Sequence, residues 1–531
     1  MRIALLTEGR QDGPAAVVRP EPGPGNGPER DREGPGPAGA AGWGERLAAG
    51  LPEHEFERYL LLPGAAPGPA PQPGVHRLAL GGPARGGRGP GTVRRRHYAQ
   101  AYEDLVRALV QPRERAGFAV GLHALAELTR QDGALPAFLA SDHAHRVLER
   151  VWRSPGADTA AGQPLLRDVL VAGDLLEQCL RPLTADWYGS GPGGLGGVDL
   201  CHVVGGGPAA LPALVAKQLY GVPFVLTEHG LHLREQYLGY RQAPYRWPVR
   251  ALLLSYFRQL TAETYRQAAL LTPGSGYDRE WQLRCGAEPD RIRVVYQGTA
   301  AVDRPAAGPE PAEPTLLWSG RLEPAADPEL MLHAFARVRT ELPAARLLLR
   351  GPEGRPGHRE HLAELADRLK LTPAVTFAEA GEGDWTDGTV AVFSGRARWR
   401  SGALVGAMLS GRAVIATDVG ATRELLGPAG LLVPPGDPAA LAVACRALLA
   451  DRERRSRLGL AGRLRAQERF AVEPAVAAFR EVYLELVTRW PAYPAVERRA
   501  GALPRPFARP AEYWVAGGRP RQAAEAMAEA R

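Results

Sequence analysis

The sequence of 531 residues has few cysteines and no long hydrophobic run. Its four cysteines, Cys179, Cys201, Cys285 and Cys445, lie far apart without CxxC spacing, which argues against a zinc site or a disulfide framework. No stretch reaches the roughly 18 uncharged apolar residues of a membrane-spanning helix, and the apolar run before Glu8 is too short for a signal peptide. We therefore expect a cytoplasmic protein without a transmembrane segment, with peripheral membrane contact left open.

Strong basic charge is also missing. Lys and Arg together number 65 against 58 for Asp and Glu, so the net charge is +7. The dense basic runs of dedicated nucleic-acid-binding proteins are absent, and we expect no nucleic-acid partner. Almost every cation is an arginine, because Lys217 and Lys370 are the only lysines. Acidic or phosphorylated small ligands remain compatible with this charge.

The length predicts two or three domains. Two stretches rich in Gly, Pro and Arg, residues 11–42 and 64–96, contain little that could form a core, and we expect solvated insertions there. Residues 98–180 have the apolar spacing of helices. Short apolar runs elsewhere predict strands at 3–7, 56–62, 199–204, 223–227, 269–272 and 292–295, and again at 315–319, 346–350, 374–377, 389–393, 413–416 and 430–433.

Alternation of strands and helices is typical of parallel sheets covered on both faces. The predicted fold class is therefore α/β, with two doubly wound Rossmann-like domains that face each other across a cleft and carry low-complexity loop insertions. We expect the first domain at 1–305, the second at 314–470, a C-terminal helix at 471–490 and a Pro/Arg-rich tail at 491–531. Ligands bind such sheets at the carboxyl ends of their strands.

Four blocks of the sequence resemble, in the same order, motifs of family 4 glycosyltransferases. They are LTEHG at 226–230 with RE at 234–235, SGRL at 319–322, ATDVG at 416–420 with REL at 423–425, and GLLVPPGD at 430–437. The opening MRIALLTEG and LPEHEF at 51–56 narrow the resemblance to the PelF-like branch. The resemblance implies a GT-B fold with an acceptor-side N-terminal domain and a nucleotide-sugar-binding C-terminal domain.

The resemblance further implies the reaction. A hexose would move with retention from a nucleotide diphosphate sugar, UDP-glucose in the PelF-like case, to a polysaccharide or other glycan acceptor. No cofactor and no metal site are expected, and a polysaccharide-synthesis complex is a possible partner. On the donor side, Gly320 and Arg321 match the segment that holds the diphosphate, with an ion pair or a helix-end contact as the alternative role of Arg321. Backbone N–H groups near Gly402 could also face the diphosphate.

Three expected donor-site residues are missing. The family lysine falls at Ala326, and the two family glutamates fall at Arg398 and Gly406. Each lost bond to a buried charged group costs about 1.5 to 3 kcal/mol, so a catalytically degenerate homologue that acts as a binding or assembly subunit is the alternative function. Arg396, Arg398 and Arg400 alternate, and they could replace the lysine or form a solvated loop.

The acceptor side is predicted around the LTEHG block. His229 follows a predicted buried strand, so we expect it in the cleft as the candidate catalytic residue, although a lone histidine is more often a core or loop residue. His202 ends another predicted strand and could line the same cleft. Glu228, Arg234 and Glu235 are further acceptor-side candidates, with a surface ion pair as the alternative for the last two.

Overall fold

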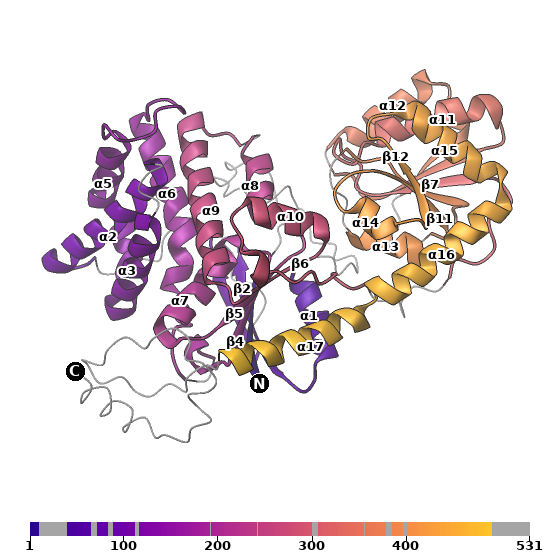
Figure 1. Ribbon diagram of the computed structural model, residues 1–531. Helices are drawn as coiled ribbons and strands as arrows, with labels where there is room; N and C mark the ends of the chain where they lie inside the picture. The colour runs from indigo at the N-terminus through magenta and orange to yellow at the C-terminus, as the bar shows by residue number, and fades with distance from the viewer. Residues whose placement is uncertain are drawn as a thin grey trace.

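The protein contains two parallel six-stranded sheets, each in its own lobe (Figure 1). The computed structural model describes residues 1–9, 40–64, 72–82, 89–111, 116–191, 193–241, 243–299, 306–354, 356–378, 385–396 and 401–490. This arrangement confirms the predicted fold class of two doubly wound α/β domains. Within these residues, no helix is long and apolar enough to cross a membrane.

The N-terminal sheet has the strand order β3-β2-β1-β4-β5-β6. Its strands are β1 (Arg2–Glu8), β2 (Glu55–Leu62), β3 (Val75–Ala79), β4 (Leu200–Val204), β5 (Phe224–Glu228) and β6 (Leu270–Pro273). All five neighbouring pairs are parallel, and Leu6 pairs with Tyr59 on one side and with Val203 on the other. Strands β4 and β5 are buried along their whole length, because helices cover both faces.

Helices surround this sheet in two groups. The helices next to it are α1 (Ala40–Gly50), α7 (Ala210–Tyr220), α8 (His232–Tyr240), α9 (Trp247–Gln267) and α10 (Gly276–Arg284). Helices α2 (Thr92–Val110), α3 (Ala116–Asp132), α4 (Leu135–Leu139), α5 (Asp142–Trp152) and α6 (Leu166–Leu180) form a bundle at the outer side of α9 (Figure 1). Local signals set several boundaries: the Ser141 side chain accepts from the Ala144 N–H at the start of α5, and Gly221 ends α7 with a φ of 73°.

The C-terminal sheet has the strand order β12-β11-β10-β7-β8-β9. Its strands are β7 (Thr315–Ser319), β8 (Arg346–Arg350), β9 (Val375–Ala378), β10 (Val390–Phe393), β11 (Ala413–Thr417) and β12 (Gly430–Val433). The covering helices are α11 (Pro328–Glu341), α12 (His358–Arg368), α13 (Ser401–Leu409), α14 (Thr422–Leu426), α15 (Pro438–Ala450) and α16 (Arg452–Phe470). In the part of the chain that the structure describes, short 3-10 turns of both lobes lie at Arg181–Thr184, Leu195–Gly197, Gly207–Ala209, Pro289–Arg291 and Thr372–Ala374. Asp437 caps α15, accepting from the N–H groups of Ala439 and Ala440 at 2.9 Å.

The last helix, α17 (Val472–Arg489), packs on the N-terminal lobe and not on the lobe that precedes it in the chain (Figure 1). It contacts α1 and β4, and Phe479 and Tyr483 are fully buried in the same cluster as Ile3, Trp43 and Leu200. The N-terminal core is therefore completed by a segment from the far end of the chain.

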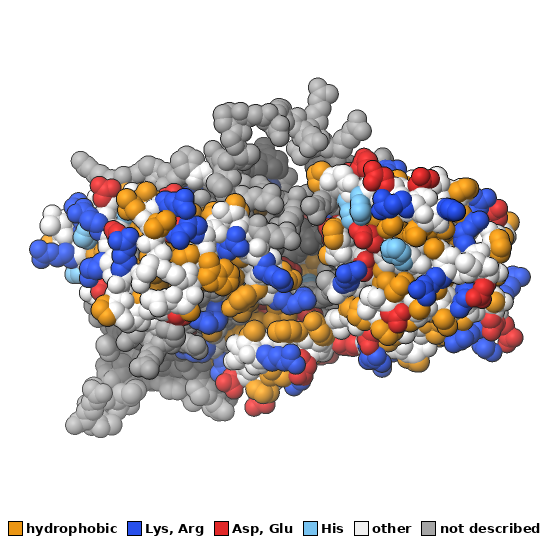
Figure 2. Space-filling view, turned by 90° about the horizontal axis from the view of Figure 1, so that it is seen from above, with side chains coloured by type: hydrophobic (Ala, Val, Ile, Leu, Met, Phe, Trp, Pro, Cys, Tyr) orange, Lys and Arg blue, Asp and Glu red, His pale blue; other side chains and the backbone are white. Residues whose placement is uncertain are grey.

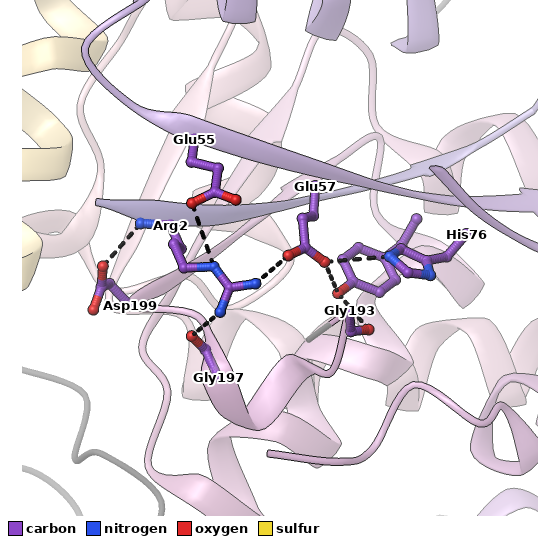
Figure 3. A network of polar contacts seen from close by, with 8 residues as sticks. Arg2, Glu55, Glu57, His76, Gly193, Gly197 and Asp199 are labelled. Atoms are coloured by element: carbon purple, nitrogen blue, oxygen red, sulfur yellow. Dashed lines mark hydrogen bonds and ion pairs between the residues drawn. The ribbon is translucent and has the colours of Figure 1, made fainter. Parts of the chain in front are cut away.

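A polar network joins the amino ends of the first strands, opposite the edge where parallel sheets bind ligands (Figure 3). The buried Glu57 carboxylate pairs with Arg2 and accepts from the Tyr59 hydroxyl at 3.0 Å, and its other neighbour is the His76 ring at 3.2 Å. Asp199 accepts from the Arg2 backbone N–H at 2.8 Å. The network ties β1, β2 and β3 to the segment before β4.

Two predictions about secondary structure were wrong. The stretch 64–96 was predicted to be a solvated insertion, but it contains β3, which pairs with β2, and the first residues of α2. Leu78 and Leu80 are buried, so a few well-spaced apolar side chains outweigh the surrounding Gly and Pro. The predicted strand at 292–295 is reduced to an isolated bridge between Ile292 and Leu271. Residues 11–39 of the other stretch lie outside the described residues, as does the tail 491–531.

Candidate functional site

The carboxyl ends of the two sheets meet through the side chain of Glu424. This residue lies on α14, which follows β11, and it reaches the start of α10, which follows β6. Its Oε1 accepts from the Gly276 N–H and the Tyr296 hydroxyl, both at 2.8 Å, and its Oε2 accepts from the Tyr277 N–H at 3.3 Å. A carboxylate is favourable at a helix N-terminus because the free N–H groups carry partial positive charge. Glu424 thus connects the segments that follow β11 and β6, at the carboxyl ends of the two sheets.

Arg321 lies on the loop that follows β7, at the carboxyl end of the C-terminal sheet. Its side chain is 31% exposed, and its Nε is 3.8 Å from Glu323 Oε2, too long for a firm ion pair. Backbone bonds fix the loop: Gly320 N–H donates to Arg350 at 3.0 Å, and Leu322 N–H donates to Pro352 at 2.9 Å. The guanidinium therefore keeps most of its donors available on a well-positioned backbone.

Arg396 brings a second guanidinium to the same edge. It follows β10, the strand next to β7, and its backbone N–H donates to Ala325 at 3.2 Å in the loop after Arg321. Its side chain pairs with Asp327, whose buried carboxylate also accepts from the Leu330 N–H at 3.2 Å. This ion pair raises the pKa of Arg396. The Arg396 side chain is still 66% exposed. Its Nε is bound to Asp327, and the exposed part of the guanidinium is accessible to a ligand.

The remaining donor-side candidates are placed only in part. Arg398 lies outside the described residues. Gly402 is in the first turn of α13, and a Cβ there would meet no atom within 4 Å, so the backbone has open space beside it. Ala326, at the family lysine position, is buried in the core of the C-terminal lobe.

On the other sheet, Glu228 ends β5 as a buried carboxyl group, only 1% exposed. It accepts from the Tyr265 hydroxyl at 2.6 Å, from Gln282 Nε2 at 2.9 Å and from the His232 N–H at 3.4 Å. Burial raises its pKa to about 7, with a further contribution from Asp278, although its three donors act in the opposite direction. Glu228 thus connects β5, α8, α9 and α10.

The raised pKa of Glu228 makes stability depend on pH. The folded state holds the proton more tightly than the unfolded chain, so this carboxyl group destabilises the fold increasingly as pH rises from about 4.5 to about 7. Glu228→Gln removes the titration. We therefore expect the difference in the free energy of unfolding, variant minus wild type, to be larger at pH 8 than at pH 5 by about 2 to 3 kcal/mol. Urea unfolding at both pH values measures it. The matched control is Glu364→Gln on the exposed face of α12, which should show no such difference; an equal response of both variants would contradict the prediction.

His202 was predicted to line the cleft, and the structure places it in the core. It is fully buried, and both ring nitrogens are engaged, Nδ1 with the Tyr483 hydroxyl at 2.6 Å and Nε2 with Thr227 Oγ1 at 2.7 Å. Burial, aided by nearby His229, lowers its pKa to about 3. His202 is thus a neutral structural residue that joins β4 and β5 to α17, which is the more common role of a histidine in a buried strand.

His229, Arg234 and Glu235 lie at the carboxyl edge of the N-terminal sheet. His229 is half-buried with its Nε2 buried, and its ring packs edge-on against Trp43, with ring centroids 4.7 Å apart. Gly274 lies close beside it, since a Cβ there would be 2.9 Å from His229 Cδ2. Arg234 and Glu235 are in the first turn of α8, and Glu235 is exposed. Burial and the Glu235 charge raise the pKa of Glu8, at the end of β1, to about 7.

Sequence reasoning missed a glycine loop at this edge. Gly205, Gly206 and Gly207 follow β4 with φ values of 99°, 76° and 61°. A Cβ on Gly206 would lie 3.1 Å from Glu228 Oε1, and one on Gly207 would lie 2.3 Å from His232 Nε2. Only glycine suits this backbone and this packing. Three successive glycines directly after a predicted strand were the available signal.

Comparisons with known families agree with this two-lobe division. Residues 37–290 match the family described as "Domain of unknown function (DUF3492)". Residues 313–451 match the family described as "Glycosyl transferases group 1".

Relatives and solved structures extend the likeness. The chain is 32% identical to a D-inositol 3-phosphate glycosyltransferase of Streptomyces bingchenggensis over 38% of its own length, and 30% identical to one of Geodermatophilus obscurus over 57%. It spans about half of the first relative (49%) and 69% of the second.

Among solved structures, Anabaena HepE in complex with UDP and glucose superposes with a TM-score of 0.53 at 14% identity, covering 92% of this chain and 100% of HepE. A glycosyltransferase from Rickettsia africae superposes with a TM-score of 0.52 at 12% identity, covering 92% of this chain and 98% of that protein. At these identities the structural likeness concerns the fold.

Proposed function

Because the chain belongs to the group 1 family of glycosyltransferases and has the two-domain GT-B fold, we propose that it transfers a hexose from a nucleotide diphosphate sugar to a glycan acceptor. We further propose UDP-glucose as the donor, retention at the anomeric carbon, no requirement for a bound metal ion and a place in the PelF-like branch. The four ordered sequence blocks support these finer points, and a structural neighbour that holds UDP and glucose is compatible with them.

The observation that carries the proposal is the pair of arginines at the carboxyl ends of two adjacent strands. Arg321 follows β7 and Arg396 follows β10. When a glycosidic bond to a diphosphate breaks, negative charge builds on the phosphate oxygens, and fixed cations stabilise that charge. A planar guanidinium donates two parallel hydrogen bonds to such oxygens. Asp327 holds Arg396 in place, so this guanidinium needs little reordering to meet a ligand.

The acceptor would approach from the N-terminal lobe. His229, Arg234 and Glu235 are polar groups at the carboxyl edge of that sheet, suited to bind glycan hydroxyls. Glu424 joins the carboxyl-end loops of the two lobes, and this contact supports a donor and an acceptor that are bound between the same two lobes. Sugar transfer requires this proximity.

A second candidate function is supported by Gly406. The family glutamate position falls at this residue within α13, where no side chain is present to bind a donor hydroxyl. The protein would then be a catalytically degenerate homologue that binds a nucleotide sugar within a polysaccharide-synthesis complex and transfers nothing.

One titration separates the two functions. Purified protein is titrated with UDP and with UDP-glucose by calorimetry, and release of UDP from UDP-glucose is then followed with and without EDTA. We expect binding of both ligands and EDTA-insensitive release of UDP. Binding without release would favour the degenerate subunit, and the absence of binding would remove both functions.

A further inference from the structure

Seven large apolar side chains are exposed on three helices of the N-terminal lobe, of which α9 contacts the other two. They come from the start of α6, from α8 and from the start of α9, and each is between 36% and 60% exposed. We call this set the apolar patch; its members are Leu165, Leu166, Leu170, Val171, Tyr237, Leu238 and Trp247. Exposed apolar side chains gathered in this way on a folded domain typically mark an interaction surface.

Specific contacts bring the three helices of the patch together. Arg246, at the start of α9, pairs with the buried Asp168 in the first turn of α6. Arg250, on α9, donates from Nε to the Tyr245 carbonyl at 2.5 Å and from Nη1 to the Arg241 carbonyl at 3.2 Å. These bonds attach the residues that follow α8 to the first turn of α9. Helix α9 also packs directly against α6 and α8.

The surroundings of the patch are rich in arginine. Arg167 is exposed between Leu166 and Leu170 on α6, and Arg241 and Arg246 are exposed between α8 and α9. The facing carboxylates are fewer: Asp168 is buried in its pair with Arg246, and Asp174 and Glu235 are exposed at the margins. Figure 2 looks down on this end of the molecule, and its left-hand lobe shows apolar side chains interleaved with basic ones.

The patch lies on the same side as the candidate site. Helix α8 starts directly after the carboxyl end of β5 and carries Arg234 and Glu235 in its first turn and Tyr237 and Leu238 further along. Helix α9 ends just before β6 begins, so its first turn, with Trp247, lies towards the carboxyl ends of the strands. The acceptor edge and the patch are therefore neighbours.

We propose that the apolar patch docks the N-terminal lobe on a lipid bilayer with anionic headgroups. Trp and Tyr suit the boundary between headgroups and acyl chains, where an apolar ring and a polar group are both accommodated. Arginines near an anionic surface add electrostatic attraction to it. A second copy of the chain fits poorly, because two like patches would bring their arginines together. Docking would present the acceptor edge to glycans carried at the membrane, and it does not depend on the proposed catalysis.

Vesicle sedimentation of the full chain tests the proposal. We expect binding to vesicles of phosphatidylcholine and phosphatidylglycerol in equal parts, weaker binding at high salt, and little binding to phosphatidylcholine alone. The double variant Leu166→Asp/Leu170→Asp should lower the partition coefficient roughly tenfold or more. A second double variant, Arg167→Glu/Arg241→Glu, should lower it on anionic vesicles as well.

The matched control is Leu460→Asp/Leu464→Asp, which changes two comparably exposed leucines on α16 of the other lobe. It should bind vesicles as wild type does, and thermal unfolding of all variants should be unchanged. Wild-type protein that stays in solution with anionic vesicles would overturn the proposal, as would equal loss in the control. A concentration-dependent dimer that the Leu166→Asp/Leu170→Asp variant abolishes, without vesicle binding by wild type, would instead make the patch a protein interface.

Discussion

Replacing Arg321 with alanine should raise the dissociation constant for UDP by tenfold or more. A hydrogen bond to a charged group is worth about 1.5 to 3 kcal/mol, and Arg321 keeps its donors available because its contact with Glu323 is long, at 3.8 Å. The same weak contact means that the variant should lose little stability. Calorimetric titration with UDP measures the binding, and thermal unfolding checks the fold.

Three further variants sharpen this test. Arg321→Lys keeps the charge but loses the planar fork, so its dissociation constant should lie between those of wild type and Arg321→Ala. Arg396→Ala should also weaken binding. The control is Arg368→Ala, on an exposed part of α12, which should bind UDP as wild type does. A dissociation constant unchanged in Arg321→Ala would show that this side chain does not contact the diphosphate.

Gly351→Ala should cause the largest loss of stability, at least about 3 kcal/mol in the free energy of unfolding. A Cβ at this position would lie 1.8 Å from the Gly320 carbonyl oxygen, and the φ of 148° is unfavourable for any residue with a side chain. The atom in the way belongs to the backbone, so a rotamer change cannot relieve the clash. Because Gly320 precedes Arg321, UDP binding should weaken at the same time. Urea unfolding monitored by circular dichroism gives the stability.

Gly402→Ala is the matched control for that substitution. A Cβ there meets nothing within 4 Å, and alanine favours a helix over glycine by up to about 1 kcal/mol. We expect the stability of this variant to equal or slightly exceed that of wild type. A Gly351→Ala protein as stable as the Gly402→Ala protein would show that the loop after β8 is looser than its contacts indicate.

Much of the fold could be predicted from local pattern. Among the described residues, eleven of the twelve strands coincide with short apolar runs, because strands buried on both faces need continuous apolar sequence. The exception, β3, has only two well-buried apolar side chains, Leu78 and Leu80, in or beside it, and the Gly and Pro around it hid the signal. The position of α17 was not predictable either. Amphipathic spacing shows that a helix buries one face, but it does not show which lobe that face packs against.

The candidate site was predictable as a set of positions and not as a set of contacts. The motifs indicated the edges that carry Arg321 and His229. They did not reveal that His202 is bonded to a tyrosine 281 residues away or that Arg396 pairs with Asp327, because such partners are chosen by packing between distant segments. Burial also decides the protonation of Glu228, and the sequence alone carries no measure of it.

The return of α17 to the first lobe affects how the protein is made. A ribosome releases the chain from its N-terminus, and domains usually fold in that order. Here the face of the N-terminal lobe that contains Ile3, Trp43 and Leu200 stays uncovered until residues 472–489 have been synthesised. The second lobe is complete before the first, so the nascent protein must keep an unfinished apolar surface out of unwanted contacts until α17 has been made.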